Sequence, residues 1–179
     1  IREMREEDLR DKIGFVPQKA FLFSGTIASN LRYARPDATD DELWHALRIA
    51  QAADFVAEMP GQLEAPVSQG GTNLSGGQRQ RIAMARALVK RPDIYVFDDS
   101  FSALDFKTDA ALRAALQEEV DDATVFIVAQ RVSTVMNADR IIVLDQGEIV
   151  GMGTHEELME KCPVYREIVF SQLSEEEVA

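Results

Sequence analysis

The fold of this chain is decided by the stretch Leu74-Ser75-Gly76-Gly77-Gln78-Arg79-Gln80-Arg81. Ser75 and Gln78 have the spacing of a capping box, which opens a helix, and apolar residues then recur at helical spacing until Pro92 ends it. The glycines allow another molecule to approach the backbone, and the N–H groups of the first turn lack partners within the helix. Such a helix start can bind a phosphate group, although the cap alone equally fits an ordinary helix with a flexible start.

A buried strand is expected about twenty residues further on, at Ile94-Tyr95-Val96-Phe97. The strand ends in Asp98-Asp99, and Ser102-Ala103-Leu104-Asp105 follows. An apolar run just after a helix-ending proline indicates a strand of a parallel sheet. Because open parallel sheets bind ligands at the carboxyl ends of their strands, the two carboxylates are candidates for a ligand site.

The order of these features resembles the nucleotide-binding domain of ATP-binding cassette (ABC) proteins. The matching features are LSGGQ at 74–78, the strand with its paired acids, and SALD at 102–105. The resemblance implies an α/β fold of the P-loop NTPase type, with a RecA-like parallel sheet and an inserted helical subdomain. We expect the RecA-like core at residues 1–24 and 93–179 and the helical subdomain, with the signature helix, at residues 25–92.

The glycine-rich phosphate loop of such ATPases, GxxxxGK[ST], is absent from this sequence, in which no lysine follows a glycine. In the ABC family that loop lies before the Gln-containing loop, as does the aromatic residue that stacks on adenine. The sequence therefore looks like a cassette without its N-terminal strands and phosphate loop, and we expect it to bind ATP very weakly alone. The resemblance places the phosphate-loop strand between the strands expected at 124–129 and 141–144, so each of these two strands should have an unpaired edge.

Composition is that of one globular domain and excludes several classes of protein. The 179 residues are 46% hydrophobic and 28% charged, unlike a disordered or fibrous chain. No apolar run reaches the length of a bilayer span, and residues 1–11 do not have the pattern of a signal peptide. A formal net charge of −12 argues against nucleic acid as a partner, but not against a nucleotide. A single cysteine, Cys162, permits no internal disulfide and is typical of a reducing compartment.

Further strands and helices alternate along the chain, as in a parallel α/β sheet. We expect strands at 13–16, 124–129, 141–144 and 148–150. Capping boxes at 39–42 and 154–157 predict two helices, and we expect others at 108–120 and from Pro163 toward Ser171. Residues 175–178 are expected to form a frayed acidic tail.

The resemblance assigns the chemistry of the site to four residues. It implies that Asp98 and Gln18 bind Mg²⁺, an ion that favours carboxylate, amide and water oxygens. It places the catalytic base at Asp99, where active cassettes carry a glutamate, and the switch residue at Gln130, where they carry a histidine. Aspartate is one methylene shorter than glutamate, and glutamine gains no proton near neutral pH. Both departures predict a degenerate site.

The resemblance also implies the partners of the chain. ABC cassettes pair head to tail, and Ser75, Gly76, Gly77 and Gln78 of one subunit cap the ATP held by the other, with Asp105 also assigned to nucleotide binding. An intact signature beside a degenerate site predicts a heterodimeric exporter of the multidrug or lipid type. Its transmembrane domains would hold this cassette at the cytoplasmic face of the cell membrane.

Two other functions remain open at this stage. The first is half of a split ATPase of the chromosome-maintenance or DNA-repair type, where the phosphate loop and the signature lie in separate lobes. The compact spacing between Gln18 and the signature, without a heptad repeat between them, counts against it. The second is a non-catalytic regulatory cassette, which the residues at Asp99 and Gln130 favour and the intact Asp98 and LSGGQ oppose.

Overall fold

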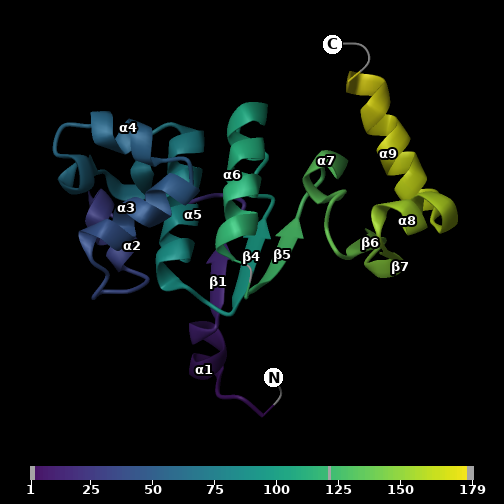
Figure 1. The fold of residues 1–179 in the computed structure, drawn as a ribbon, viewed down its shortest axis with the longest axis horizontal. Coiled ribbons are helices and arrows are strands. Elements are labelled where there is room, and N and C mark those ends of the chain that lie inside the picture. Colours follow the sequence, from purple (N-terminus) through teal and green to yellow (C-terminus); the bar gives the residue numbers. More distant parts are fainter. Residues whose placement is uncertain (1–2, 121, 177–179) are drawn as a thin grey trace. The chain divides into compact units, whose positions relative to one another are not determined.

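The computed structural model describes residues 3–120 and 122–176 (Figure 1). The chain divides into two compact units, Ile1–Val128 and Ala129–Ala179, which are considered one at a time. Among the described residues, no helix combines the length and the apolar character that crossing a bilayer requires.

A parallel sheet forms the centre of the first unit. Its strands, in spatial order, are β1 (Ile13–Val16), β4 (Ile94–Asp98) and β5 (Thr124–Val128), and both neighbouring pairs run parallel (Figure 1). Val16 and Phe97 are fully buried and face each other in the β1–β4 register. The predicted parallel α/β sheet is therefore confirmed, with β5 ending one residue earlier than expected.

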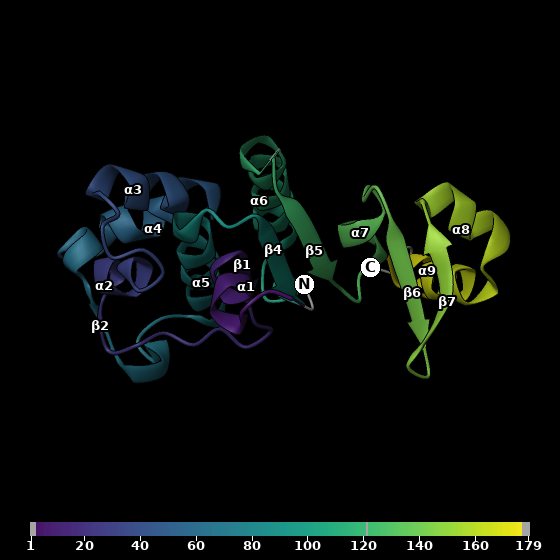
Figure 2. The same ribbon diagram turned by 90° about the horizontal axis from the view of Figure 1, so that it is seen from below.

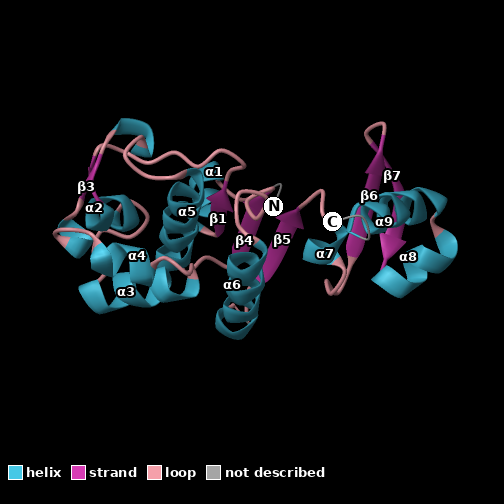
Figure 3. Cartoon of the chain, turned by 90° about the horizontal axis from the view of Figure 1, so that it is seen from above, coloured by secondary structure: helices cyan, strands magenta, loops and turns pink. Residues whose placement is uncertain are grey.

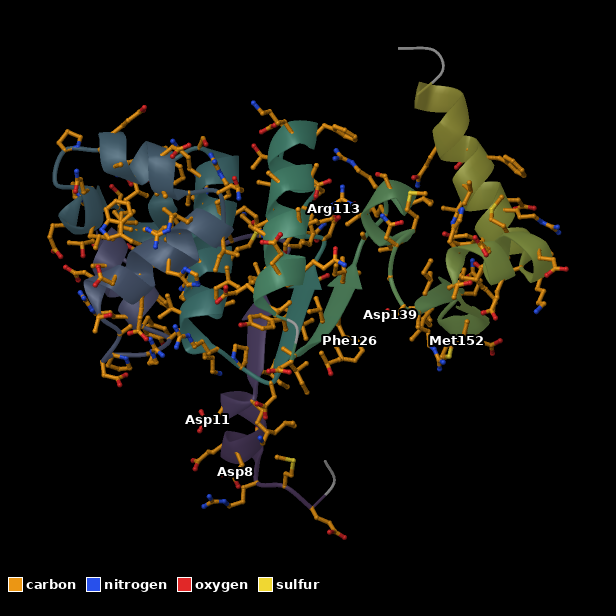
Figure 4. All side chains as sticks on the ribbon, in the orientation of Figure 1. Asp8, Asp11, Arg113, Phe126, Asp139 and Met152 are labelled. Atoms are coloured by element: carbon orange, nitrogen blue, oxygen red, sulfur yellow. The ribbon has the colours of Figure 1, made fainter. Side chains whose placement is uncertain are left out.

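The far edge of β5 has no strand partner among the described residues. Phe126, labelled in Figure 4, lies in the middle of β5 and is 52% exposed, and Val128 at its end is 54% exposed. Apolar side chains at an unpaired edge are unusual, because such an edge invites further pairing. This edge is one of the two that the resemblance expects to be unpaired.

The signature helix α5 (Gly76–Lys90) starts and ends as the sequence predicts. Ser75 is its N-cap, and Arg91 ends it in the left-handed conformation with φ 51°, directly before Pro92. The buried side of α5 packs against β1 and against two helices of the same unit, α2 (Ile27–Arg32) and α3 (Asp40–Ile49) (Figure 3). The signature is thereby fixed to both the sheet and the neighbouring helices.

The remaining elements of the first unit are short, except for one helix beside the sheet. They are α1 (Glu6–Asp11), α4 (Ala53–Glu58), α6 (Phe106–Glu119), the antiparallel pair β2 (Gly25–Thr26) and β3 (Pro66–Val67), and 3₁₀ turns at Gln62–Glu64 and Gln69–Gly71. The predicted capping box between Thr39 and Glu42 opens α3. One apolar core runs through this unit, from Val16 in β1 to Leu112 and Leu116 in α6.

The described part of the second unit, residues 129–176, contains a β-hairpin and three helices. Strands β6 (Ile141–Asp145) and β7 (Glu148–Gly153) pair antiparallel (Figure 2), and the helices are α7 (Val132–Val135), α8 (His155–Lys161) and α9 (Pro163–Glu176). A separate core joins Val143, Leu158 and Tyr165. Two predicted elements were too short. Pairing with β6 extends β7 from the expected end at 150 to Gly153, and α9 includes residues 175–176, which we expected to fray. The end of the predicted tail, residues 177–178, lies outside the described residues.

Candidate functional site

Gln18 and Asp99 meet at the carboxyl end of the parallel sheet. The Gln18 side chain donates a hydrogen bond from Nε2 to Oδ2 of Asp99, with a distance of 3.0 Å. Both residues follow neighbouring strands, and parallel strands bring their carboxyl ends to one edge of a sheet. Eighty-one positions of sequence separate the two residues, so the sheet is what joins them.

The backbone of Asp99 is held in a conformation that few residues other than glycine adopt. Its φ is 44°, in the left-handed region, which costs a non-glycine residue on the order of 1 kcal/mol or more. Two hydrogen bonds hold it there: the Asp99 N–H donates to the Val128 carbonyl at 2.8 Å, and the Ser102 hydroxyl donates to the Asp99 carbonyl at 2.8 Å. Backbone strain that the surroundings maintain is typical of functional sites.

Asp98, the last residue of β4, is half-buried, and its carboxylate has no hydrogen-bond partner among the described residues. The same residues contain no group of three or more His, Cys, Asp or Glu side chains that could enclose a metal. Mg²⁺ does not need such a group, because it commonly binds one or two carboxylates together with water and substrate phosphates. The unengaged Asp98 carboxylate beside Gln18 and Asp99 fits that ion.

We call Ser75, Gly76, Gly77 and Gln78 the signature tip. Two reciprocal hydrogen bonds close its predicted capping box: the Ser75 N–H donates to Gln78 Oε1 at 2.9 Å, and the Gln78 N–H donates to Ser75 Oγ at 3.2 Å. Ser75 and Gly76 are exposed, whereas Gly77 and Gln78 are half-buried. A β-carbon on Gly77 would lie 3.3 Å from the Ala103 carbonyl oxygen. The tip therefore packs closely against the loop that carries SALD.

Asp105 caps the helix α6. Its carboxylate accepts hydrogen bonds from the Thr108 N–H at 3.0 Å and from the Thr108 hydroxyl at 2.7 Å. These bonds stabilise the ionised form, so they lower the pKa of Asp105. The cap starts α6 at Phe106, two residues before the start that the sequence suggested. Asp105 therefore stabilises the start of α6, and its assignment to nucleotide binding stays a prediction.

Gln130 belongs to the second unit and is described there alone. Its side chain is exposed, and its carbonyl oxygen accepts a hydrogen bond from Gln172 Nε2 at 2.6 Å. The same Gln172 accepts from the Val132 N–H at 2.8 Å, so α9 fixes the start of α7. Within the first unit, the structure thus joins Gln18 to Asp99, with Asp98 directly before Asp99 at the end of β4. The role assigned to Gln130, in the second unit, stays a prediction.

Sequence reasoning missed two polar residues near the Gln18–Asp99 pair. Gln80 is 2% exposed and donates from Nε2 to the Pro17 carbonyl oxygen at 3.1 Å. Ser100 is fully buried, and its hydroxyl donates to the Val16 carbonyl oxygen at 2.9 Å. Helical spacing places Gln80 on the face of α5 that carries buried alanines, and a polar residue on an apolar face is the signal that could have found it.

Comparison with known proteins agrees with this geometry. A family model described as "ABC transporter" matches residues 1–102, more than half of the chain. The chain belongs to the ABC transporter family. An uncharacterized ABC transporter ATP-binding protein of Mycobacterium tuberculosis is 53% identical to it over 175 residues, which are 96% of this chain and 30% of that protein.

Two further relatives extend the comparison within the ABC family. A multidrug efflux ATP-binding/permease protein of Mycobacterium tuberculosis is 43% identical over 169 residues, which are 94% of this chain and 14% of that protein. The solved structure of a bacterial Atm1-family ABC exporter with ATP bound superposes with a TM-score of 0.92 and 37% identity, covering 96% of this chain and 30% of that one. The chain thus spans less than a third of the length of these relatives. The match confirms the predicted fold and the predicted family.

Proposed function

We propose that the chain is part of the ATP-binding cassette of a membrane exporter and contributes to a site for ATP and Mg²⁺. The observation that carries the proposal is the hydrogen bond between Gln18 and Asp99, which assembles two of the expected site residues at the ligand-binding edge of the sheet. The names of the relatives support a transporter rather than an ATPase of the chromosome-maintenance type. The transporter would carry this cassette at the cytoplasmic face of the membrane.

In this proposal, each residue at the sheet edge has its own task. Asp98 and the amide oxygen of Gln18 would hold Mg²⁺, which would neutralise charge on the phosphates of ATP. The Asp99 carboxylate accepts a proton from the attacking water, and the Gln18 amide orients that carboxylate. We call these three residues, with the switch position that the resemblance assigns to Gln130, the own site. No GxxxxGK[ST] motif is present in the 179 residues to hold the phosphates, so the chain on its own is inactive in hydrolysis.

We further propose that the own site is degenerate. A general base has to lie within about 2.6–3.2 Å of its proton, directly or through one water, and aspartate reaches one methylene less far than glutamate. Gln130, assigned to the switch position, offers hydrogen bonds but no protonatable group near neutral pH. General acid–base catalysis contributes about 10²–10⁴ in rate, so an own site with both departures turns over slowly.

The signature tip acts on a different nucleotide. It is exposed at Ser75 and Gly76, carries first-turn N–H groups, and has none of the departures of the own site. We propose that it caps ATP held by a second, non-identical cassette paired head to tail with this one, and that Asp105 supports the loop beside it. We also propose that the chain is divided into a core (1–24 and 93–179) and a helical subdomain (25–92). In this division the helical subdomain carries the signature tip that meets the second cassette.

The experiment restores the own site in the full-length heterodimer. Asp99→Glu together with Gln130→His should raise hydrolysis at this site by about 10²-fold when the partner's site is inactivated. Single-turnover hydrolysis of labelled ATP measures the rate, and Asp37→Glu, the same exchange at an exposed position of the same unit, is the control. An unchanged rate in the double variant, with ATP still bound, would contradict a degenerate site.

One observation favours a second function. The same departures at Asp99 and Gln130 suit a cassette that binds ATP only to regulate its partner. If the cassette is only regulatory, neutralising Asp98 should leave hydrolysis by the whole dimer unchanged. If the own site hydrolyses ATP slowly, neutralising Asp98 should abolish the slow hydrolysis at that site.

A further inference from the structure

Gln18 extends from a segment whose backbone has few hydrogen bonds of its own. Strand β1 ends at Val16, and Pro17 has no N–H group to donate. The direction in which Gln18 leaves the sheet therefore depends on groups that bind the two preceding carbonyl oxygens. Both carbonyls have such a partner: Ser100 Oγ binds Val16 at 2.9 Å, and Gln80 Nε2 binds Pro17 at 3.1 Å.

Gln80 is the anchor that comes from the signature helix. It lies five residues after Ser75, about 7.5 Å further along the axis of α5, and it is 2% exposed. A polar side chain buried to this degree is costly unless it is hydrogen-bonded, and its amide finds the carbonyl directly before Gln18. One rigid helix therefore carries the signature tip at its start and holds the Gln18 segment one turn later.

We propose that Gln80 is a positioning residue for the own site, acting through Gln18. Its hydrogen bond fixes the Pro17 carbonyl, which fixes the direction of the Gln18 side chain and so the contact between Gln18 Nε2 and the Asp99 carboxylate. Because Gln80 moves with α5, a displacement of the signature tip by the partner's nucleotide is passed to the Asp99 carboxylate. This inference rests on the proposed function of Gln18 and Asp99.

Gln80→Met in the full-length transporter dimer tests the role of Gln80. Methionine has the same unbranched length without the amide donor, and Met84→Leu, an exchange at a fully buried position of the same helix, is the matched control. With the partner's site inactivated, Gln80→Met should lower single-turnover hydrolysis at the own site about ten-fold and leave the KM for ATP unchanged. Met84→Leu should leave both unchanged.

A double-variant cycle distinguishes positioning from packing. If Gln80 acts through Gln18, then Gln80→Met should have no further effect once Gln18→Ala is present, whereas an independent packing defect would add to it. An additive result, with Gln18→Ala itself impaired, would overturn the positioning role and leave the proposed function standing. A Gln18→Ala variant with the full rate would instead refute the role proposed for Gln18 in the site.

Amide hydrogen exchange supplies a readout that does not depend on turnover. Loss of one hydrogen bond should make exchange in the peptide spanning 13–20 about five-fold faster in Gln80→Met, and Met84→Leu should not change it. Gln80→Asn keeps an amide, but its side chain is one methylene shorter and should no longer reach the Pro17 carbonyl oxygen. It therefore provides the same test if Gln80→Met does not fold. Unchanged exchange in this peptide would overturn the proposal.

Discussion

The charge at Ser75 tests whether the signature tip faces a phosphate group. Aspartate and asparagine are both good N-cap residues, so Ser75→Asp and Ser75→Asn should preserve the start of α5. The bond to be replaced joins Ser75 Oγ and the Gln78 N–H at 3.2 Å, a distance that either side-chain oxygen can reproduce. The two variants then differ in one respect, the negative charge of the aspartate.

The size of the effect follows from Coulomb's law. A carboxylate about 4 Å from a terminal phosphate is repelled by about 1 kcal/mol in bulk water, and by about 4 kcal/mol at the effective dielectric constant of a partly buried pair. Ser75 and Gly76 are exposed in this chain, but a second cassette seated on them would exclude water. We therefore expect Ser75→Asp to weaken ATP use at the partner's site by between about five-fold and 10³-fold relative to Ser75→Asn.

The assay is hydrolysis by the full-length dimer with the own site silenced by Asp98→Asn. Thermal unfolding of the two Ser75 variants provides the control, because equal midpoints show that both caps hold. If Ser75→Asp and Ser75→Asn turn over ATP at the same rate, no phosphate lies near Ser75 and the head-to-tail pairing is wrong. If both variants are equally slow and equally destabilised, Ser75 serves only as a helix cap.

Two more predictions concern acid stability and nucleotide affinity. A hydrogen bond from the Thr39 backbone, and then the ion pair with Arg35, lower the pKa of Glu42 to about 2 from an ordinary value of 4.5. The contribution of Glu42 to stability is therefore complete above pH 4.5 and is lost as the pH falls toward 2. Glu42→Gln should flatten the pH dependence of the melting temperature in this range, and an unchanged slope would contradict this prediction. The 179-residue chain alone should bind Mg·ATP very weakly, because it contains no GxxxxGK[ST] motif, and micromolar binding by isothermal titration would refute this.

Local spacing explains why the helix starts were predictable. The capping boxes that begin at Ser75, Thr39 and Thr154 each close within three residues, and all three formed as the sequence indicated. Strand β4 was equally predictable, because a short apolar run directly after Pro92 is typical of a buried strand. These features depend on neighbours along the chain, which a sequence displays directly.

Contacts between distant residues could not be derived in this way. The bond from Gln80 to Pro17 spans 63 positions, and it exists because α5 packs on β1. The left-handed φ of Asp99 is likewise maintained by a carbonyl of β5 that only the folded sheet brings near. The cap that the Asp105 carboxylate forms with Thr108 is a local feature that the sequence could have shown, because aspartate is a common N-cap residue.

The length of the Gln18–Asp99 bond bears on how a degenerate own site would arise. At 3.0 Å the shorter carboxylate already reaches the Gln18 amide, so replacement of glutamate by aspartate has not broken this contact. A glutamate at this position would have one methylene too many for the same backbone, and its carboxylate would have to bend or move Gln18. Asp99→Glu alone should therefore recover less than the double change with Gln130→His. On the proposed function, the own site would differ from an active one in how far its base projects, and it would keep the link through Gln18 to the signature helix.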